Sequence, residues 1–181
     1  NQLLNMVFLL FNVTAVGTSV MCALYFGAKD TKSFTQVVGV SLLFNAIIGI
    51  IISALLTFGG KQMLVWMDIR PNLMPMAVTY MQIVGGFGFF QAISFTVSAV
   101  LRAANKPNYA MQVTCLINIF NIIGNYSLIY GHFGFPEMGI QGAAISTSVC
   151  RGLGMLFLFF VLFKRLIHRM PLAYFRPFPF D

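Results

Sequence analysis

Three asparagines, Asn118, Asn121 and Asn125, interrupt an otherwise apolar stretch, "NIFNIIGNYSLIYG" at 118–131. Side-chain amides both donate and accept hydrogen bonds, so this group could hold a polar solute or an ion. Spacings of three, four and seven residues place all three on one stripe of a helix. Because an unpaired amide in hydrocarbon costs several kcal/mol, the stripe must face other helices or a wet cavity.

Spacing alone leaves two interpretations of the stripe open. In the structural one, the amides are interhelical hydrogen-bond partners worth ~0.6–2 kcal/mol each, and Gly124 lets a neighbouring helix approach closely. In the functional one, the amides line a pathway for a solute or an ion. Polar residues on other apolar segments favour a cavity, because structural hydrogen bonding alone needs fewer of them. These residues are Asn5, Asn12, Thr14, Thr18, Ser19, Gln91, Ser94, Thr96, Ser98 and Thr147.

Arg151 is the deepest cation, roughly 18 Å from the cytoplasmic end of its predicted helix at 1.5 Å per residue. Such an arginine needs carbonyls, a carboxylate or water, and interior scaffolding is favoured over direct solute contact. The acids Asp30, Asp68, Glu137 and Asp181 and the histidines His132 and His168 all lie outside the apolar segments. If the protein is an ion-driven transporter, the carboxylate that binds the coupling ion must therefore come from elsewhere.

The elements that position these residues are predicted to be membrane-spanning helices. Of the 181 residues 59% are hydrophobic and 8% charged, against roughly a quarter charged in an ordinary globular domain. Segments of about 20 apolar residues can span a bilayer as a helix, and no strand-like alternation is present. The prediction is an all-α bundle of five helices in 1–163, at 3–26, 34–59, 75–101, 108–131 and 139–163.

The remaining segments are assigned from charge. Turns and tail on one side carry eight Lys and Arg and the opposite side only Lys61 and Arg70, so residue 1 is expected outside and residue 181 in the cytoplasm. Residues 61–74 are expected to lie in the external interface, and 164–181 to form a cytoplasmic linker. Membrane topology accounts for the net charge of +7, so no nucleic acid is expected. The three cysteines suit packing, and no motif indicates an enzyme, a metal site or a cofactor.

Specific stretches resemble the MATE family, the multidrug and toxic compound extrusion transporters. Residues 1–30 resemble its second transmembrane helix, "AVLRAANKPNYAM" at 99–111 the turn between helices four and five, and 121–151 the end of helix five through helix six. The five helices would then be helices two to six of a twelve-helix transporter. Helix one and the C-terminal lobe of the same protein would be missing from this chain.

The resemblance implies a secondary active antiporter in a prokaryotic plasma membrane, exporting small cationic or amphipathic organic compounds in exchange for H⁺ or Na⁺. The amide pair of the family site matches Asn121 and Asn125, its threonine matches Thr147, and Ala143 lies one turn earlier. The acid that these residues face in many members would lie before residue 1. The turn at 103–106 departs from the family pattern, as does Asn125, where some members carry an acid. A lipid-linked sugar flippase of the same superfamily and a purely structural membrane subunit are the alternatives.

Overall fold

The computed structural model describes residues 2–66, 70–131 and 136–165, and every regular element in these ranges is helical. The helices are α1 (Gln2–Gly27), α2 (Thr31–Trp66), α3 (Met74–Gly86), α4 (Gly88–Ala103), α5 (Pro107–Tyr130) and α6 (Gly139–Arg165), with a short 3₁₀ helix η1 (Pro71–Leu73) before α3. Four of these helices are long and apolar enough to span a membrane, and the η1–α3 segment with α4 provides a fifth span. The predicted five-helix, all-α membrane fold is confirmed.

The third predicted span is not one straight helix. The segments on either side of Phe87 meet at an angle of 43°. The sequence here, "GGFGFF", contains three glycines, which weaken a helix and let the neighbouring helix come close. Ser53 of α2 stabilises the break, because its Oγ accepts a hydrogen bond of 3.1 Å from the backbone N–H of Phe89. That N–H lies in the first turn of α4, where it has no partner within the helix.

The segment 61–74, expected in the external interface, does not begin as a separate segment, because 61–66 continue the second span. The helix α2 continues through Gly59 and Gly60 to Trp66, giving 36 residues, or roughly 54 Å, which exceeds a hydrocarbon core of about 30 Å. Tertiary packing outweighs the low helix propensity of glycine: a Cβ added at Gly60 would lie 3.2 Å from the sulfur of Met81 in α3. Residues 67–69 lie outside the described residues.

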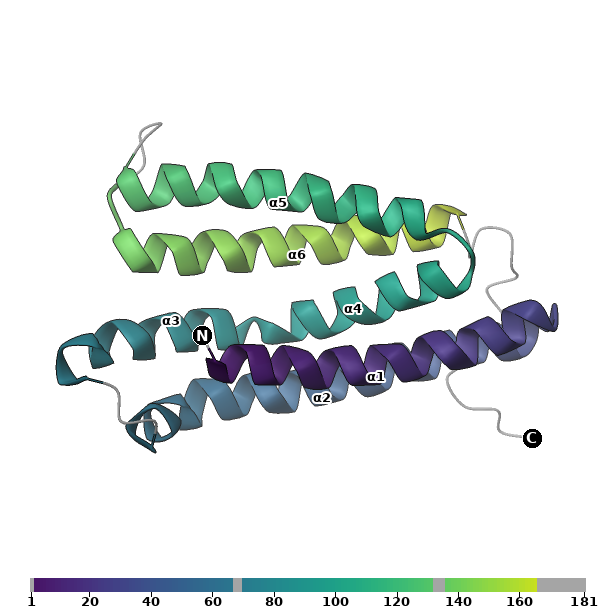
Figure 1. Cartoon of the computed structure of the whole chain (residues 1–181), viewed down its shortest axis with the longest axis horizontal. Coiled ribbons are helices and arrows are strands. Elements are labelled where there is room, and N and C mark those ends of the chain that lie inside the picture. The colour runs from purple at the N-terminus through teal and green to yellow at the C-terminus, as the bar shows by residue number, and fades with distance from the viewer. Residues whose placement is uncertain (1, 67–69, 132–135, 166–181) are drawn as a thin grey trace.

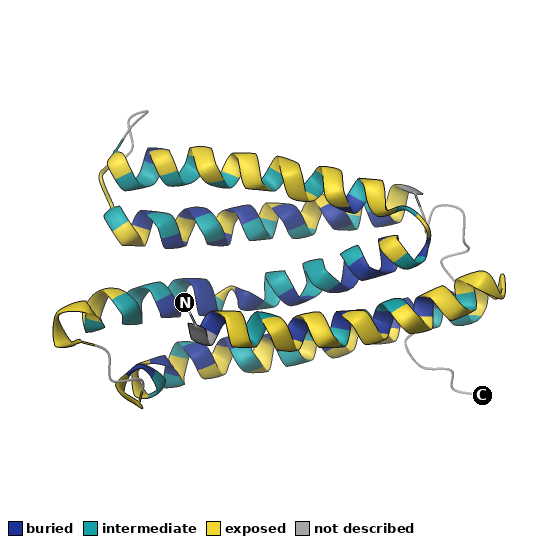
Figure 2. Ribbon diagram, viewed as in Figure 1, coloured by how far each residue is buried: buried dark blue, intermediate teal, exposed yellow. Residues whose placement is uncertain are grey.

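The helix α4 occupies the middle of the bundle. It contacts α1 and α2 on one side and α5 and α6 on the other, as Figure 1 shows. Colouring by burial makes the same point: α4 is largely buried, whereas α5 exposes most of its surface (Figure 2). Side chains of α4 are therefore held firmly, and α5 presents one face to α6 and α4 while the rest of it is open.

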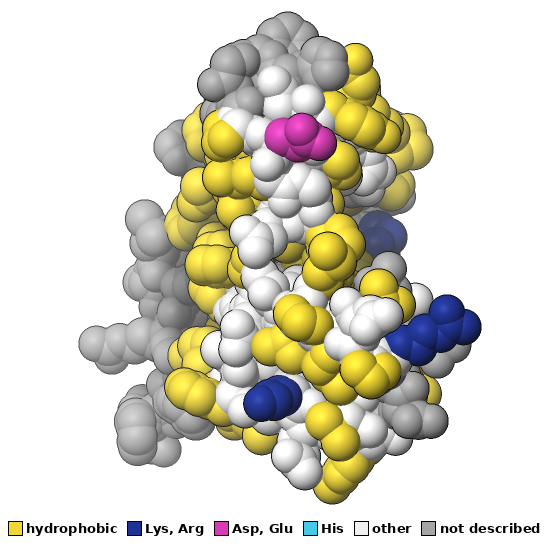
Figure 3. Space-filling model, turned by 90° about the vertical axis from the view of Figure 1, so that its left-hand side faces the viewer, with side chains coloured by type: hydrophobic (Ala, Val, Ile, Leu, Met, Phe, Trp, Pro, Cys, Tyr) yellow, Lys and Arg dark blue, Asp and Glu magenta, His cyan; other side chains and the backbone are white. Residues whose placement is uncertain are grey.

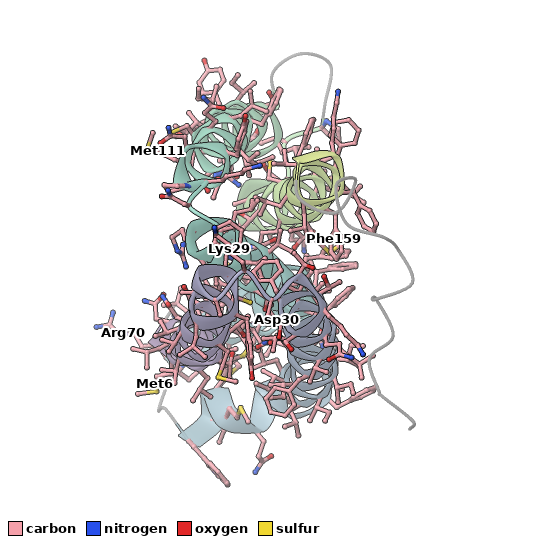
Figure 4. The ribbon with its side chains drawn as sticks, turned by 90° about the vertical axis from the view of Figure 1, so that its right-hand side faces the viewer. Met6, Lys29, Asp30, Arg70, Met111 and Phe159 are labelled. Carbon is pink, nitrogen blue, oxygen red and sulfur yellow. The ribbon has the colours of Figure 1, made fainter. Side chains whose placement is uncertain are left out.

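Cationic residues gather at one end of the bundle. The turn between α1 and α2, which carries Lys29, lies at this end, as do the α4–α5 turn with Arg102 and the C-terminus of α6 (Figures 1 and 4). Figure 3 views the opposite end, where hydrophobic side chains cover much of the surface and charged ones are few. At the cationic end the carboxylate of Asp30 caps α2 by accepting a 3.1 Å hydrogen bond from the backbone N–H of Ser33. Hydrogen bonds from Ser33, first from its side chain and then from this N–H, lower the pKa of Asp30.

The boundary predicted at residue 163 also shifts slightly. The helix α6 continues to Arg165, so Lys164 and Arg165 belong to the bundle's last helix. The rest of the predicted linker, 166–181, lies outside the described residues. Of the three cysteines, all free, Cys22 and Cys150 are buried, as packing residues should be, whereas Cys115 is exposed on α5.

Candidate functional site

A half-open cavity of about 490 Å³ lies between α4, α5 and α6, and three of the side chains on it, Arg102, Thr114 and Asn118, are exposed. Along α6 it extends from Thr147 to Leu158, which is roughly 16 Å of helix. Its size falls in the range of small-molecule sites, about 300–1,000 Å³. Polar and cationic side chains from all three helices line it: Gln91, Ser94, Ser98 and Arg102 from α4, Thr114, Asn118 and Asn121 from α5, and Thr147 and Arg151 from α6.

A short chain of hydrogen bonds joins α5 to α6 at one end of this cavity. The Nδ2 of Asn125 donates to the Oδ1 of Asn121 over 3.1 Å, and the Nδ2 of Asn121 donates to the Oγ1 of Thr147 over 3.5 Å. The Oδ1 of Asn125 is buried and accepts no hydrogen bond from the described residues. Because buried polar atoms are rarely left unpaired, this oxygen is a position where a donor or a cation would be stabilised.

The predicted site residues divide into two groups. Asn118, Asn121 and Thr147 line the cavity, whereas Asn125 and Ala143 do not. Asn125 instead lies one turn beyond Asn121 and is bonded to it, and Ala143 is half-buried one turn before Thr147. The structure therefore brings the two asparagines and the threonine together and leaves Ala143 as part of the surrounding helix packing.

Polar residues of α1 do not join the cavity, contrary to the expected convergence. Asn5 and Asn12 are exposed. Thr14 donates a hydrogen bond to the Oδ1 of Asn45 in α2, and Asn45 is buried with only 1% of its surface exposed. Thr18 donates to a backbone carbonyl of its own helix, an alternative that hydroxyl side chains in membrane helices often take. The two threonines are thus hydrogen-bonded away from the cavity, and every residue that lines it belongs to α4, α5 or α6.

Small residues hold α5 and α6 close enough to form this site. A Cβ added at Gly124 would overlap the hydroxyl of Ser146, and one added at Gly142 would lie 2.5 Å from the carbonyl oxygen of Leu128. Both contacts cross between α5 and α6: Gly124 lies between the two hydrogen-bonded asparagines along α5, and Leu128 lies about one turn beyond Asn125. The expected role of Gly124 in close approach is confirmed, and Gly142 has the same role from the opposite helix.

Arg151 lines the cavity near the middle of α6. Its guanidinium carbon lies 4.5 Å from the centre of the Phe8 ring of α1, within the range of a cation–π contact. Its Nη1 is buried and has no hydrogen-bond partner among the described residues. Arg102 contributes a second cation to the lining, and no acidic residue is part of it. The described cavity is therefore electropositive.

Sequence reasoning missed several members of the site. Arg102 was counted only as a turn cation, although its position at the end of α4 places it on the cavity. Thr114 was not among the predicted residues, although it lies four residues before Asn118 and belongs to the same stripe. That spacing was available in the sequence, whereas the position of Arg102 depends on how α4 and α5 meet.

A family model and curated relatives match this chain. The family model described as MatE matches residues 1–127. An uncharacterized transporter YisQ of Bacillus subtilis is 37% identical over 95% of this chain, which spans 38% of that relative. A probable multidrug resistance protein NorM of Thermotoga maritima is 32% identical over 91% of the chain, which spans 36% of it. The chain thus spans little more than a third of these curated relatives.

Solved structures show the same fold. A MATE crystal structure in the bent conformation superposes with a TM-score of 0.78 at 26% identity, over 85% of this chain and 34% of that one. The outward-facing conformation of a multidrug resistance MATE family transporter of the MOP superfamily gives a TM-score of 0.82 at 22% identity, over 98% of this chain and 39% of that one.

Proposed function

The chain belongs to the MATE transporter family, and from that premise we propose that the protein containing it is a secondary active transporter. It exports cationic or amphipathic organic compounds across the plasma membrane in exchange for H⁺ or Na⁺. The chain supplies five membrane spans to one half of a transporter that works by alternating access. Its cation-rich end faces the cytoplasm, as the bias of Lys and Arg predicts.

The observation that carries this proposal is the polar cavity between α4, α5 and α6. Amides and hydroxyls in a membrane bundle are expensive unless they pair or meet water, and here they gather around one space of about 490 Å³. A bundle held together only by structural hydrogen bonds would have no need of such a space.

The coupling chemistry follows from the unpaired oxygen of Asn125. A buried amide oxygen without a donor suits either the O–H of a protonated carboxyl group or a Na⁺ ion. We assign Asn121, Asn125 and Thr147 to bind a carboxylate supplied by another part of the protein and to tune its charge through hydrogen bonds. Protonation or Na⁺ binding at that group would then shift the bundle between two arrangements with different affinity for the exported compound.

An efflux assay on the intact protein tests this assignment. Cells or everted vesicles carrying the full-length protein are loaded with ethidium, and its export is followed by fluorescence under an imposed H⁺ or Na⁺ gradient. The variant with Asn121→Ala and Asn125→Ala should lose ion-dependent export. Asn108→Ala is the matched control, because Asn108 is an exposed asparagine on the same helix outside the cavity. Ion-driven export that is unchanged in the double variant would show that the assigned site is wrong.

A structural subunit is the second candidate, because Asn121 and Asn125 do bond to one another. That role predicts no water between the helices. A single cysteine at position 121, in a protein whose native cysteines are replaced, distinguishes the two functions. Reaction with a water-soluble thiol reagent supports the transporter, and complete protection supports the structural role. The flippase alternative would require several cations to hold a pyrophosphate. Two arginines, Arg102 and Arg151, line the described cavity, which is fewer than that role calls for.

A further inference from the structure

Arg151 lies near the centre of the bilayer span formed by α6. It is 12 residues from the start of the helix and 14 from its end, or roughly 18 and 21 Å. A guanidinium at that depth retains its charge and is strongly disfavoured unless anionic or hydrogen-bonding partners surround it. The partners that the described residues provide for Arg151 therefore show which kind of partner the site is missing.

The described partners of Arg151 leave its charge uncompensated. The ring of Phe8 lies against the guanidinium, and Tyr80 of α3 interacts with it electrostatically. The acids within the described ranges, Asp30 and Glu137, lie in turns at the ends of the bundle. The buried Nη1 has no hydrogen-bond partner there. Interior scaffolding, the role favoured from sequence, would instead require carbonyl or carboxylate partners within the bundle.

The cavity beside Arg151 is lined by polar and apolar side chains together. Thr147 lies one turn before the arginine on α6, and Gln91, Ser94 and Ser98 line the wall formed by α4. Apolar side chains lie among these polar ones, including Phe95, Val113 and Leu158. The space is far larger than one carboxylate side chain would fill, and a lining that offers a cation beside apolar surface suits a molecule with an anionic group and an apolar body.

We propose that this cavity binds an amphipathic organic acid, with Arg151 as the counter-charge to its carboxylate and the apolar wall around Phe95 holding its body. The planar fork of a guanidinium matches the two oxygens of a carboxylate, and desolvation strengthens that pair. The inference rests on the proposed export function and adds to it: the exported compounds include amphipathic ones that carry an anionic group, either alone or in a zwitterion.

Binding measurements on the purified full-length protein in lipid nanodiscs test the proposal. The probe is naphthalene-1-acetate, and its neutral counterpart of nearly equal size is naphthalene-1-acetamide. The wild-type protein should bind the acid roughly ten- to a hundredfold more tightly than the amide. Arg151→Gln should abolish this preference. Arg151→Lys, which keeps the charge but not the fork, should keep part of it, and Arg102→Gln should weaken acid binding less than Arg151→Gln.

Three results would overturn the proposal: no acid binding to the wild-type protein, equal binding of acid and amide, or a preference that survives in Arg151→Gln. The first is also the outcome expected if a carboxylate from another part of the protein occupies Arg151. Should Arg151→Gln elute as aggregate, the comparison of Arg151→Lys with the wild-type protein decides instead. Ethidium efflux is measured on the same variants reconstituted into liposomes. Efflux without acid preference refutes this inference alone, and acid preference without ion-driven efflux refutes the proposed function alone.

Discussion

The contact between Gly124 and Ser146 sets the spacing of the two helices that carry the asparagines and Thr147. A Cβ added at Gly124 would overlap the Ser146 hydroxyl, yet it would lie 3.5 Å from the Ser146 Cβ, an ordinary contact. The obstruction is therefore one oxygen atom. Gly124→Ala should destabilise the protein by about 1–3 kcal/mol, the usual range for overpacking a core.

The Ser146 hydroxyl also leads to predictions for Ser146→Ala alone and for the double variant Gly124→Ala with Ser146→Ala. Ser146 Oγ is buried and makes no hydrogen bond with the described residues. Ser146→Ala alone should therefore be neutral or stabilising, because an unpaired buried hydroxyl costs about 1–3 kcal/mol. Combining the two changes removes the obstruction. The double variant should regain most of the stability lost in Gly124→Ala, with a coupling of about 1–3 kcal/mol.

The assay is the midpoint of thermal unfolding of the full-length protein in detergent, for the wild type, both single variants and the double variant. Gly17→Ala is the control, since an added Cβ there meets nothing within 4 Å. A double variant as unstable as Gly124→Ala would refute the steric argument. So would a Gly124→Ala protein as stable as the wild type.

Four further variants probe two helix contacts and two helix caps. Gly142→Ala should lower the unfolding midpoint more than Gly154→Ala, because its added Cβ meets backbone at 2.5 Å rather than a side chain at 3.4 Å; an equal effect would contradict this. Ser53→Ala should destabilise the protein by about 1 kcal/mol by leaving the partly buried N–H of Phe89 unpaired, and a midpoint unchanged from wild type would argue against that cap. Asp30→Ala should remove the cap on Ser33. Because the pKa of Asp30 is lowered in the folded protein, its contribution should be full above pH 3.8 and shrink as pH falls below that value. Unfolding midpoints of Asp30→Ala and wild type, compared across pH, should therefore converge in acid; a constant difference would show that the charge is not involved.

Local sequence signals predicted the number of spans and most of their ends. The break near Phe87 and the extension of α2 past Gly60 were not predicted, although the glycines were visible. A glycine permits both a close contact and a break, and the choice depends on the partner. Met81 packs against Gly60 and the helix continues, whereas Ser53 accepts the freed N–H near Phe87 and the helix bends.

For the polar residues, too, the sequence predicted some features and the packing of helices decided others. The stripe formed by Asn118, Asn121 and Asn125 was readable from the sequence, because helical periodicity and the cost of a bare amide in hydrocarbon are local properties. The sequence did not predict which polar groups share a cavity. Thr14 pairs with Asn45 and leaves the site, whereas Arg102 joins it.

The sequence by itself determined that this is a five-span helical membrane protein with a polar stripe that must face inward, since those conclusions depend only on composition and spacing. Tertiary structure decided which helices enclose the cavity and that Arg151 lies within it without a carboxylate from the described residues. The physical reason is that hydrogen-bond partners and charge neutralisation are properties of pairs of residues far apart in the chain, and only the packing of helices brings such pairs together.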